Sequence, residues 1–292
     1  MQSSAQLHRS GSYRHIDVHP IAGALGAEVS GVDLASAGEA ALREVHEAFL
    51  RHQVLFFRGQ RLSVGQQKAF AEQFGPLFVH PYVKPLAGHP EVIEIVKEPG
   101  DKGNFGGRWH ADLTYLPEPM LGAALYALEV PPHGGDTLFA SMYAALEALS
   151  PGMQDLLRGL SAVHDDRATG LFQTERIRAM GLRDVARDEH GSPIGSRSVH
   201  PVCRAHPVTG RAALFVNCIS TIRFDGMSEA ESKPVLDYLF RHLQRPEFTC
   251  RFRWAPGSLA LWDNRCTQHL ALNDYHGYRR VMRRVLIASP DG

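Results

Sequence analysis

Short blocks of hydrophobic residues, separated by polar segments rich in glycine and proline, run along this chain of 292 residues. Apolar positions at helical spacing predict helices over 39–52, over two stretches within 141–160, and over 228–243. Runs of β-branched and aromatic residues predict short strands, at 54–58, 92–96, 121–130, 199–203, 213–217, 249–254, 257–262 and 280–288. The glycine-punctuated segment 21–34 predicts further short strands and turns.

Three helix starts are marked by local sequence. The segments 63–66 (Ser-Val-Gly-Gln) and 228–231 (Ser-Glu-Ala-Glu) both fit the capping box, in which a serine and a residue three positions later satisfy each other's backbone amides. The first predicts a helix ending near Gly75-Pro76, and the second a helix ending near Leu243. Pro151 favours the start of the second stretch within 141–160.

Short strands, frequent turns and helices at intervals favour a single mainly β domain over 1–292, with a sandwich or barrel core and helical decoration. Residues 1–12 are small and polar, which indicates a loose tail. Residues 165–198 are charged and weakly periodic, so we expect a mobile excursion that covers the functional site, with 80–108 as a further part of that cover.

The composition narrows the choice of partners and location. Lys+Arg and Asp+Glu both number 31, and this balance predicts neither nucleic-acid nor membrane binding. The four cysteines form no Cys-x-x-Cys pair, and no apolar run reaches the length of about 20 residues that spans a membrane. We therefore expect a cytoplasmic protein whose ligand is a small anion held by a few local cations.

Three His-x-Asp triplets occur, at 15–17, 110–112 and 164–166, so the triplet alone is weak evidence for a metal site. The first adjoins the loose tail, and the third begins the charged excursion without aromatic neighbours in sequence. His110 and Asp112 follow an apolar tryptophan and precede what resembles a strand, where positions i and i+2 share a face. The alternative for any one of these histidines is a surface or hydrogen-bonded core residue.

A third candidate metal ligand, His269, lies far downstream in the sequence. It follows the strand 257–262 and is expected in a polar turn. Two histidines and one carboxylate can occupy one face of an iron(II) ion and leave the other face open, as oxygenases require. The alternative is a surface histidine, but that leaves the following arginines unexplained. Arg280 and Arg284 share a face of the last strand with Met282; if that face is inward, both need anionic partners. In the alternative, Val281 and Val285 point inward and both arginines are solvated.

Four segments resemble, in order and spacing, the taurine dioxygenase (TauD/TfdA) family: 109–115 (Trp-His-Ala-Asp-Leu-Thr-Tyr), 134–137 (Gly-Gly-Asp-Thr), 214–217 (Leu-Phe-Val-Asn) and 262–269 (Trp-Asp-Asn-Arg-Cys-Thr-Gln-His). The likeness extends from about Ile16 to Ser289. This family includes alkylsulfatase and phenoxy-herbicide dioxygenases. The resemblance implies a double-stranded β-helix (jelly roll), iron(II), 2-oxoglutarate as cosubstrate, dioxygen, and a homo-oligomer, either dimer or tetramer.

The resemblance also implies roles for individual residues. The iron ligands would be His110, Asp112 and His269. The distal carboxylate of 2-oxoglutarate would be held by Thr137 and Arg280. The substrate would be bound by His80, Tyr82, Val83, Gly106, Leu113, Ser220 and Arg284, with His80 and Arg284 on its anionic end. No further side chain is predicted to act in catalysis.

Three of these positions differ from taurine dioxygenase, namely Val83, Gly106 and Ser220, and they remove polar and aromatic walls suited to a small aminosulfonate. We therefore expect a larger anion, an alkylsulfonate or alkyl sulfate, that is hydroxylated with release of sulfite or sulfate. Two alternatives stay open: a dioxygenase of the same fold acting on a carboxylate such as an aryloxyalkanoate, and a non-enzymatic jelly-roll protein that binds a metal or an anion. A carboxylate at Asp112 disfavours halogenation, because it leaves no coordination position for chloride.

Overall fold

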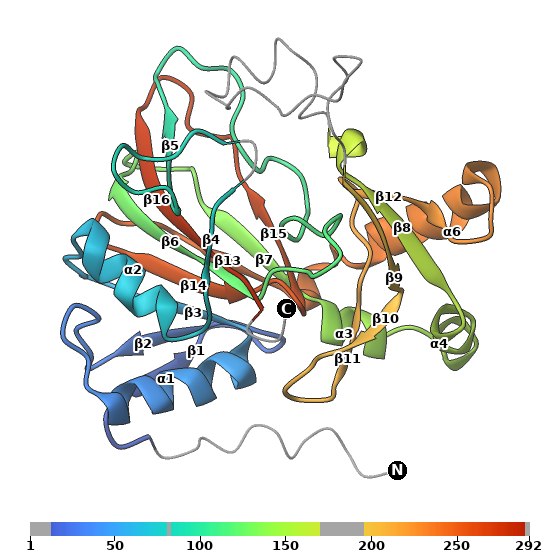
Figure 1. Cartoon of the computed structure of the whole chain (residues 1–292), viewed down its shortest axis with the longest axis horizontal. Helices are drawn as coiled ribbons and strands as arrows, with labels where there is room; N and C mark the ends of the chain where they lie inside the picture. Colours follow the sequence, from blue (N-terminus) through green and yellow to red (C-terminus); the bar gives the residue numbers. More distant parts are fainter. Residues whose placement is uncertain (1–12, 81–82, 170–195, 290–292) are drawn as a thin grey trace.

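The computed structural model describes residues 13–80, 83–169 and 196–289, which form packed β-sheets with helices against them (Figure 1). The helical elements are α1 (Glu39–His52), α2 (Val64–Glu72), α3 (Met142–Glu147), α4 (Pro151–Arg158), η2 (Asp166–Thr169), α6 (Glu229–His242) and η3 (Pro246–Phe248). The strands are β1 (Asp17–Pro20), β2 (Ala27–Ser30), β3 (Val54–Phe57), β4 (Leu77–Phe78), β5 (Val92–Lys97), β6 (Gly122–Glu129), β7 (Thr137–Ser141), β8 (Ser161–Asp165), β9 (Arg197–Pro201), β10 (Cys203–Ala205), β11 (Ala212–Leu214), β12 (Thr221–Phe224), β13 (Thr249–Phe252), β14 (Leu259–Asp263), β15 (Thr267–Ala271) and β16 (Arg280–Ile287).

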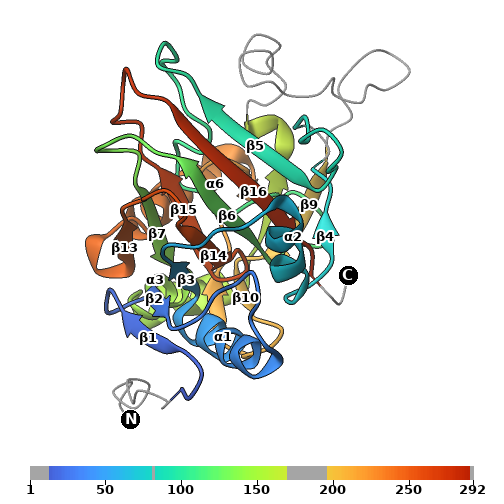
Figure 2. The same ribbon diagram turned by 90° about the vertical axis from the view of Figure 1, so that its left-hand side faces the viewer.

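The largest sheet has eight strands and carries the last strand of the chain near its edge. Its order is β1-β2-β3-β14-β6-β16-β4, and β5 pairs with β16. Figure 2 shows β5, β16, β6 and β14 following one another across this sheet. A second sheet, β13-β7-β15, faces it, and a third, β12-β8-β9, lies beside α6. The expectation of a mainly β core with helical decoration is confirmed.

Aromatic side chains fill the space between the first two sheets. Phe56 of β3 stacks on Phe252 of β13, with ring centroids 4.0 Å apart, and Phe139 of β7 meets Phe56 edge-on at 5.5 Å. The opposite face of the large sheet is covered by α1 and α2, through residues such as Phe49 and Phe70. The large sheet is therefore fixed from both sides, and it gives the functional residues a rigid base.

The helices begin where the sequence predicts. Ser63 and Ser228 each accept a hydrogen bond from the N3 amide, and the N3 side chains return the bond, so both capping boxes are present. Pro151 lies in the first turn of α4, and α1 covers the predicted range 39–52. In the part of the chain that the structure describes, no helix is both long and apolar enough to cross a membrane.

Two expectations about the candidate ligands' backbone were wrong. His110 forms a single β-bridge, and the residues after it turn instead of forming a strand, with Leu113 at φ 52°. His269 lies within β15, whereas we expected a turn. Because of β15, the last 45 residues form four strands instead of the three that we predicted there. Residues 267–269 are polar and therefore look like a turn in the sequence. They form a buried strand because the surrounding elements cover all three.

The charged region after residue 164 is only partly the excursion that we expected. His164 lies in the buried middle part of strand β8 and has aromatic neighbours after all, since its ring centroid is 5.4 Å from His200 and 5.6 Å from Phe215. Strand β9 begins at Arg197 and η2 covers 166–169. Residues 170–195 of the predicted cover and the predicted tail, residues 1–12, lie outside the described residues. The other predicted part of the cover, 80–108, includes the strand β5, and its segment 103–108 lines a cavity beside the candidate ligands; whether it moves stays a prediction.

The last strand, β16, is buried along its whole length. Arg280 and Arg284 are 6% and 4% exposed, so the alternative with solvated arginines was wrong. Val285 points to the other face and packs in the cluster that α1 and α2 cover. The neighbouring Arg283 is also buried and donates to Gln67 Oε1 at 2.6 Å. This strand therefore presents Arg280 and Arg284 to the space between the sheets.

Candidate metal centre and active site

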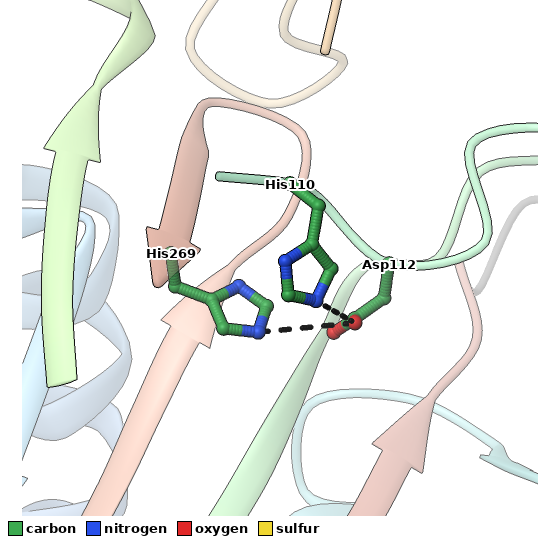
Figure 3. Close-up of side chains that lie close together, drawn as sticks. All are labelled: His110, Asp112 and His269. Carbon is green, nitrogen blue, oxygen red and sulfur yellow. Dashed lines mark ion pairs between the residues drawn. The ribbon is translucent and has the colours of Figure 1, made fainter. Parts of the chain in front are cut away.

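A pair of backbone hydrogen bonds places His110 next to His269. The His110 amide donates to the His269 carbonyl at 3.1 Å, and the His269 amide donates to the His110 carbonyl at 2.8 Å. The two imidazole centroids are consequently only 4.2 Å apart (Figure 3). Residues 159 positions apart in sequence thus share one rigid backbone contact. Their side chains therefore lose little conformational entropy when they bind one ion together.

Hydrogen bonding fixes the orientation of the His110 ring. Its Nδ1 lies 2.7 Å from the Arg108 carbonyl oxygen, which can only accept, so Nδ1 carries the proton. In the neutral form of the ring, this places the lone pair of Nε2 on the side of Asp112, whose Oδ1 is 3.5 Å away. An imidazole that donates its other N–H to a carbonyl is the usual form of a metal-binding histidine.

Asp112 is held by contacts from the large sheet. Asn264 Nδ2 donates to Asp112 Oδ2 at 3.1 Å, and Trp262 Nε1 donates to Asn264 Oδ1 at 3.0 Å. The Arg284 guanidinium forms an ion pair with the same Asp112 oxygen. Burial raises the pKa of the Asp112 carboxyl, but Arg284 and the two imidazoles more than offset burial, so this pKa lies well below its usual range. The carboxylate is therefore charged at neutral pH.

His269 completes the cluster from β15. Its Nε2 is 3.9 Å from Asp112 Oδ1, and the ligand atoms of the three residues all lie within 4.8 Å of one another (Figure 3). Burial, followed by the proximity of His110, lowers the pKa of His269 well below its usual value, so the ring is neutral and can act as a ligand. Ligands at about 2.1 Å from one ion can be no more than about 4.2 Å apart, and the separations of both Nε2 atoms from Asp112 Oδ1 meet this limit. Two imidazole nitrogens and one carboxylate oxygen suit iron(II).

The turn between β14 and β15 is braced by a buried ionic network. Asp263 accepts two hydrogen bonds from the Arg265 guanidinium, at 2.8 and 2.6 Å, and another from His206 at 2.9 Å. Burial raises the pKa of Asp263, but the Arg265 and His206 hydrogen bonds reverse this effect and lower it. Burial raises the pKa of the adjacent Cys266 thiol well above its usual value, so this cluster lacks a thiolate ligand. Its role is to hold β15, and with it His269.

Next to the candidate ligands, a small cavity reaches Thr137 and Arg280. Both residues line it, together with His110, His269 and Arg284. The Nε and Nη2 atoms of Arg280 are buried and have no hydrogen-bond partner among the described residues. The hydroxyl of Thr137 accepts from Trp254 Nε1 at 2.9 Å, which leaves its own proton for another acceptor. An anion between the metal position and Arg280 would satisfy this buried charge.

A second cavity, of about 270 Å³, also borders the cluster; it is larger than the first and is called the larger cavity below. Its lining includes five of the residues predicted to contact substrate: His80, Gly106, Leu113, Ser220 and Arg284. Val83 lines a different cavity, near Arg280, and Tyr82 lies outside the described residues. The backbone amide of Val83 donates to His80 Nδ1 at 3.1 Å, so the neutral ring carries its proton on Nε2.

Several residues of the site were not singled out from the sequence. Asn264 stands within the quoted segment 262–269, yet only the fold shows that it joins Asp112 to Trp262. Arg108 contributes through its carbonyl oxygen, for which a sequence gives no signal. The segment 103–107 lines the larger cavity, and Asn104 anchors it through a 2.9 Å hydrogen bond to the Ala271 carbonyl.

Residues 17–286 match the family described as "Taurine catabolism dioxygenase TauD, TfdA family". The chain belongs to the TauD/TfdA family. An alpha-ketoglutarate-dependent sulfate ester dioxygenase of Pseudomonas putida is 35% identical, over 98% of this chain and 94% of that protein. An alkylsulfatase of Acinetobacter baylyi is 32% identical, over 94% of this chain and 86% of that protein.

Solved structures agree with the TauD/TfdA assignment. A taurine dioxygenase from Burkholderia xenovorans superposes with a TM-score of 0.79 at 33% identity, covering 96% of this chain and 93% of that one. The jelly-roll expectation is thereby confirmed. The protein is an enzyme, a dioxygenase that depends on 2-oxoglutarate (alpha-ketoglutarate), iron(II) and dioxygen, and the non-enzymatic alternative was wrong.

Proposed function

We propose that this dioxygenase acts on an alkyl sulfate, hydroxylating the carbon that carries the ester oxygen. The hydroxylated ester then breaks its carbon–oxygen bond, giving an aldehyde and sulfate. The observation that carries this proposal is the shared lining of the larger cavity, where the cation Arg284 and the N–H donor of His80 border the same space as His110 and Asp112. Two relatives, named as a sulfate ester dioxygenase and an alkylsulfatase, support the choice of ester.

In this proposal each part of the site has one task. The metal would be held by His110, Asp112 and His269, and with 2-oxoglutarate it supplies the oxidation of a carbon–hydrogen bond by dioxygen. Arg280 and Thr137 bind the distal carboxylate of the cosubstrate, in a bidentate geometry that a guanidinium offers and an ammonium does not. Arg284 and His80 orient the sulfate end, so that the adjacent carbon faces the metal.

The substrate's apolar remainder would extend along Gly106, Leu113 and Ser220, which line the larger cavity. Gly106 has φ 78°, and a Cβ there would lie 3.3 Å from His110 Cε1, so a side chain at this position would crowd the ligand ring. Contacts with an alkyl chain are worth about 25 cal/mol per Å² buried, which predicts graded affinity with chain length instead of sharp discrimination.

The deciding assay measures succinate formation with iron(II), 2-oxoglutarate and oxygen, in parallel for alkyl sulfates, alkylsulfonates, taurine and aryloxyacetates. We expect the largest stimulation from alkyl sulfates, with one sulfate released per succinate. His80→Leu should raise the KM for the alkyl sulfate, while His80→Gln, which keeps an N–H donor, should raise it less. Preferential turnover of taurine would contradict the proposal.

A carboxylate substrate such as an aryloxyacetate is the second candidate. It is favoured by one observation: Arg284 already pairs with a carboxylate, that of Asp112, and its fork of donors fits a substrate carboxylate equally well. Turnover of aryloxyacetates in preference to alkyl sulfates, in the same assay, would decide for this candidate.

The homo-oligomer, dimer or tetramer, and the cytoplasmic location remain predictions. Light scattering coupled to gel filtration measures the first directly, and a mass equal to one chain of 32.3 kDa would contradict it. Fractionation of cells that produce the full chain tests the second.

A further inference from the structure

Arg280 borders two cavities. One is the small cavity shared with His110 and His269, to which we assign the cosubstrate. The other is a cavity of about 380 Å³ whose lining contains Arg280 but none of the three candidate metal ligands. It lies against β5, the segment 101–105 and Tyr275. The established activity and the proposed substrate give this second space no occupant.

A second buried cation, Lys97, lines this cavity. Lys97 is 5% exposed, and its Nζ has no hydrogen-bond partner among the described residues. Its Nζ lies over the ring of Tyr275, 4.0 Å from the centroid, which is a favourable but uncharged contact. No carboxylate in the described part of the chain is within ion-pair distance of Lys97.

Lys97 and Arg280 are also direct cross-strand partners in the pairing of β5 with β16. Like charges opposite each other on neighbouring strands destabilise a sheet, and burial strengthens the effect. Of the nearby acids, Glu98 pairs with Arg279 and Asp136 with Arg251. The two acids that line the cavity, Glu94 and Asp101, are exposed to solvent, and neither is within ion-pair distance of Lys97. Two adjacent buried cations thus lack protein counter-charges.

One cosubstrate carboxylate on Arg280 supplies a single negative charge and leaves Lys97 without a partner. We propose that the 380 Å³ cavity binds a second small dicarboxylate, with one carboxylate on Lys97 and on the edge of Arg280 that faces this cavity. The apolar side chains of Val83, Ile93 and Ile95 line the same space and suit the methylene carbons of such an anion better than bare sulfate. This inference rests on the proposed function, because it assigns the other cavity beside Arg280 to 2-oxoglutarate.

Calorimetric titration of the manganese(II)-loaded full chain tests the proposal, with 2-oxoglutarate and succinate as separate probes. The wild-type chain should bind two equivalents of 2-oxoglutarate, one of which disappears when the metal is chelated. Lys97→Met should lose the metal-independent equivalent, with affinity at least tenfold lower, and should keep the metal-dependent one. Comparing the two probes shows whether the second site takes the cosubstrate, the product succinate, or both.

The matched control is Lys102→Met, because Lys102 lines the same cavity but is exposed. It should bind both equivalents of 2-oxoglutarate. Lys97→Arg keeps a cation at position 97 and should therefore also bind the metal-independent equivalent, unlike Lys97→Met. Without ligand, Lys97→Met should melt at a higher temperature than wild type, since it removes an unpaired buried charge. A single equivalent in the wild type, or binding of inorganic sulfate but not of either dicarboxylate, would overturn the inference. Absence of the metal-dependent equivalent would instead contradict the proposed function.

Discussion

Asn264 offers a sharp test of how the metal centre is supported. Its side chain donates to Asp112 Oδ2 and accepts from Trp262 Nε1, and it is 3% exposed. Asn264→Leu keeps the branched shape and the number of side-chain heavy atoms but removes both hydrogen bonds, together with a longer one of 3.3 Å that Asn264 Oδ1 accepts from the Asp112 amide. The buried indole N–H would then lack an acceptor, at a cost of about 1–3 kcal/mol, and the carboxylate would lose a charge-assisted bond worth about 1.5–3 kcal/mol.

We therefore expect Asn264→Leu to lower the free energy of unfolding by about 2.5–6 kcal/mol, measured by urea denaturation of the metal-free protein. Loss of an outer partner of a ligand typically weakens metal binding about 10–100-fold. Titration with manganese(II) measures that second effect. Arg284 still pairs with Asp112 in the variant, so binding should weaken but not vanish.

Trp262→Phe separates the two effects. It removes the indole donor but leaves the hydrogen bond from Asn264 to Asp112, so stability should fall while metal affinity stays close to wild type. If Asn264→Leu loses stability with unchanged metal affinity, the side chain supports the fold alone and our account of Asp112 is wrong. Unchanged stability in both variants would contradict the hydrogen bonds themselves.

Three further outcomes follow from the structure. Arg280→Lys should raise the KM for 2-oxoglutarate about 10–100-fold, because one of two charge-assisted bonds is lost, and should leave the KM for the sulfate ester unchanged in steady-state assays. Burial, and then the charge of His200, lowers the pKa of His164 to about 3, so the folded protein keeps this ring neutral. The contribution of His164 to stability should be complete above about pH 6.5 and should fall as the pH drops toward 3. Urea titrations at several pH values measure this effect, and in His164→Phe the free energy of unfolding should depend less steeply on pH. Gly106→Ala should weaken manganese(II) binding, because its Cβ would press on the His110 ring, and an affinity equal to wild type would show that the loop relaxes freely.

The sequence predicted the chemistry of the site better than its backbone. The three residues selected as candidate ligands, His110, Asp112 and His269, do lie together in the fold, and the family resemblance supported that selection more than their local pattern did. The elements themselves were misjudged: His269 belongs to β15, whose polar residues look like a turn, and the residues after His110 turn at Leu113. Burial by distant segments decided both cases.

Contacts between distant segments also explain what the sequence could not predict. His164 was set aside for lack of aromatic neighbours, yet Phe215, 51 residues later, lies beside it. Lys97 ends a strand that was predicted correctly, but its position opposite Arg280 depends on the register of β5 with β16. Such pairings are set by the whole sheet, and no local pattern records them.

The complete burial of β16 has a consequence for how this protein can change over evolutionary time. The strand carries Arg280 and Arg284 on one face, while its other face packs under the helices, so nearly every substitution within it carries a structural penalty. The larger cavity, by contrast, draws much of its wall from connecting segments such as 103–107 and 219–220. New substrates can therefore be acquired by drift in these connections, while the oxidising chemistry beneath them is inherited intact.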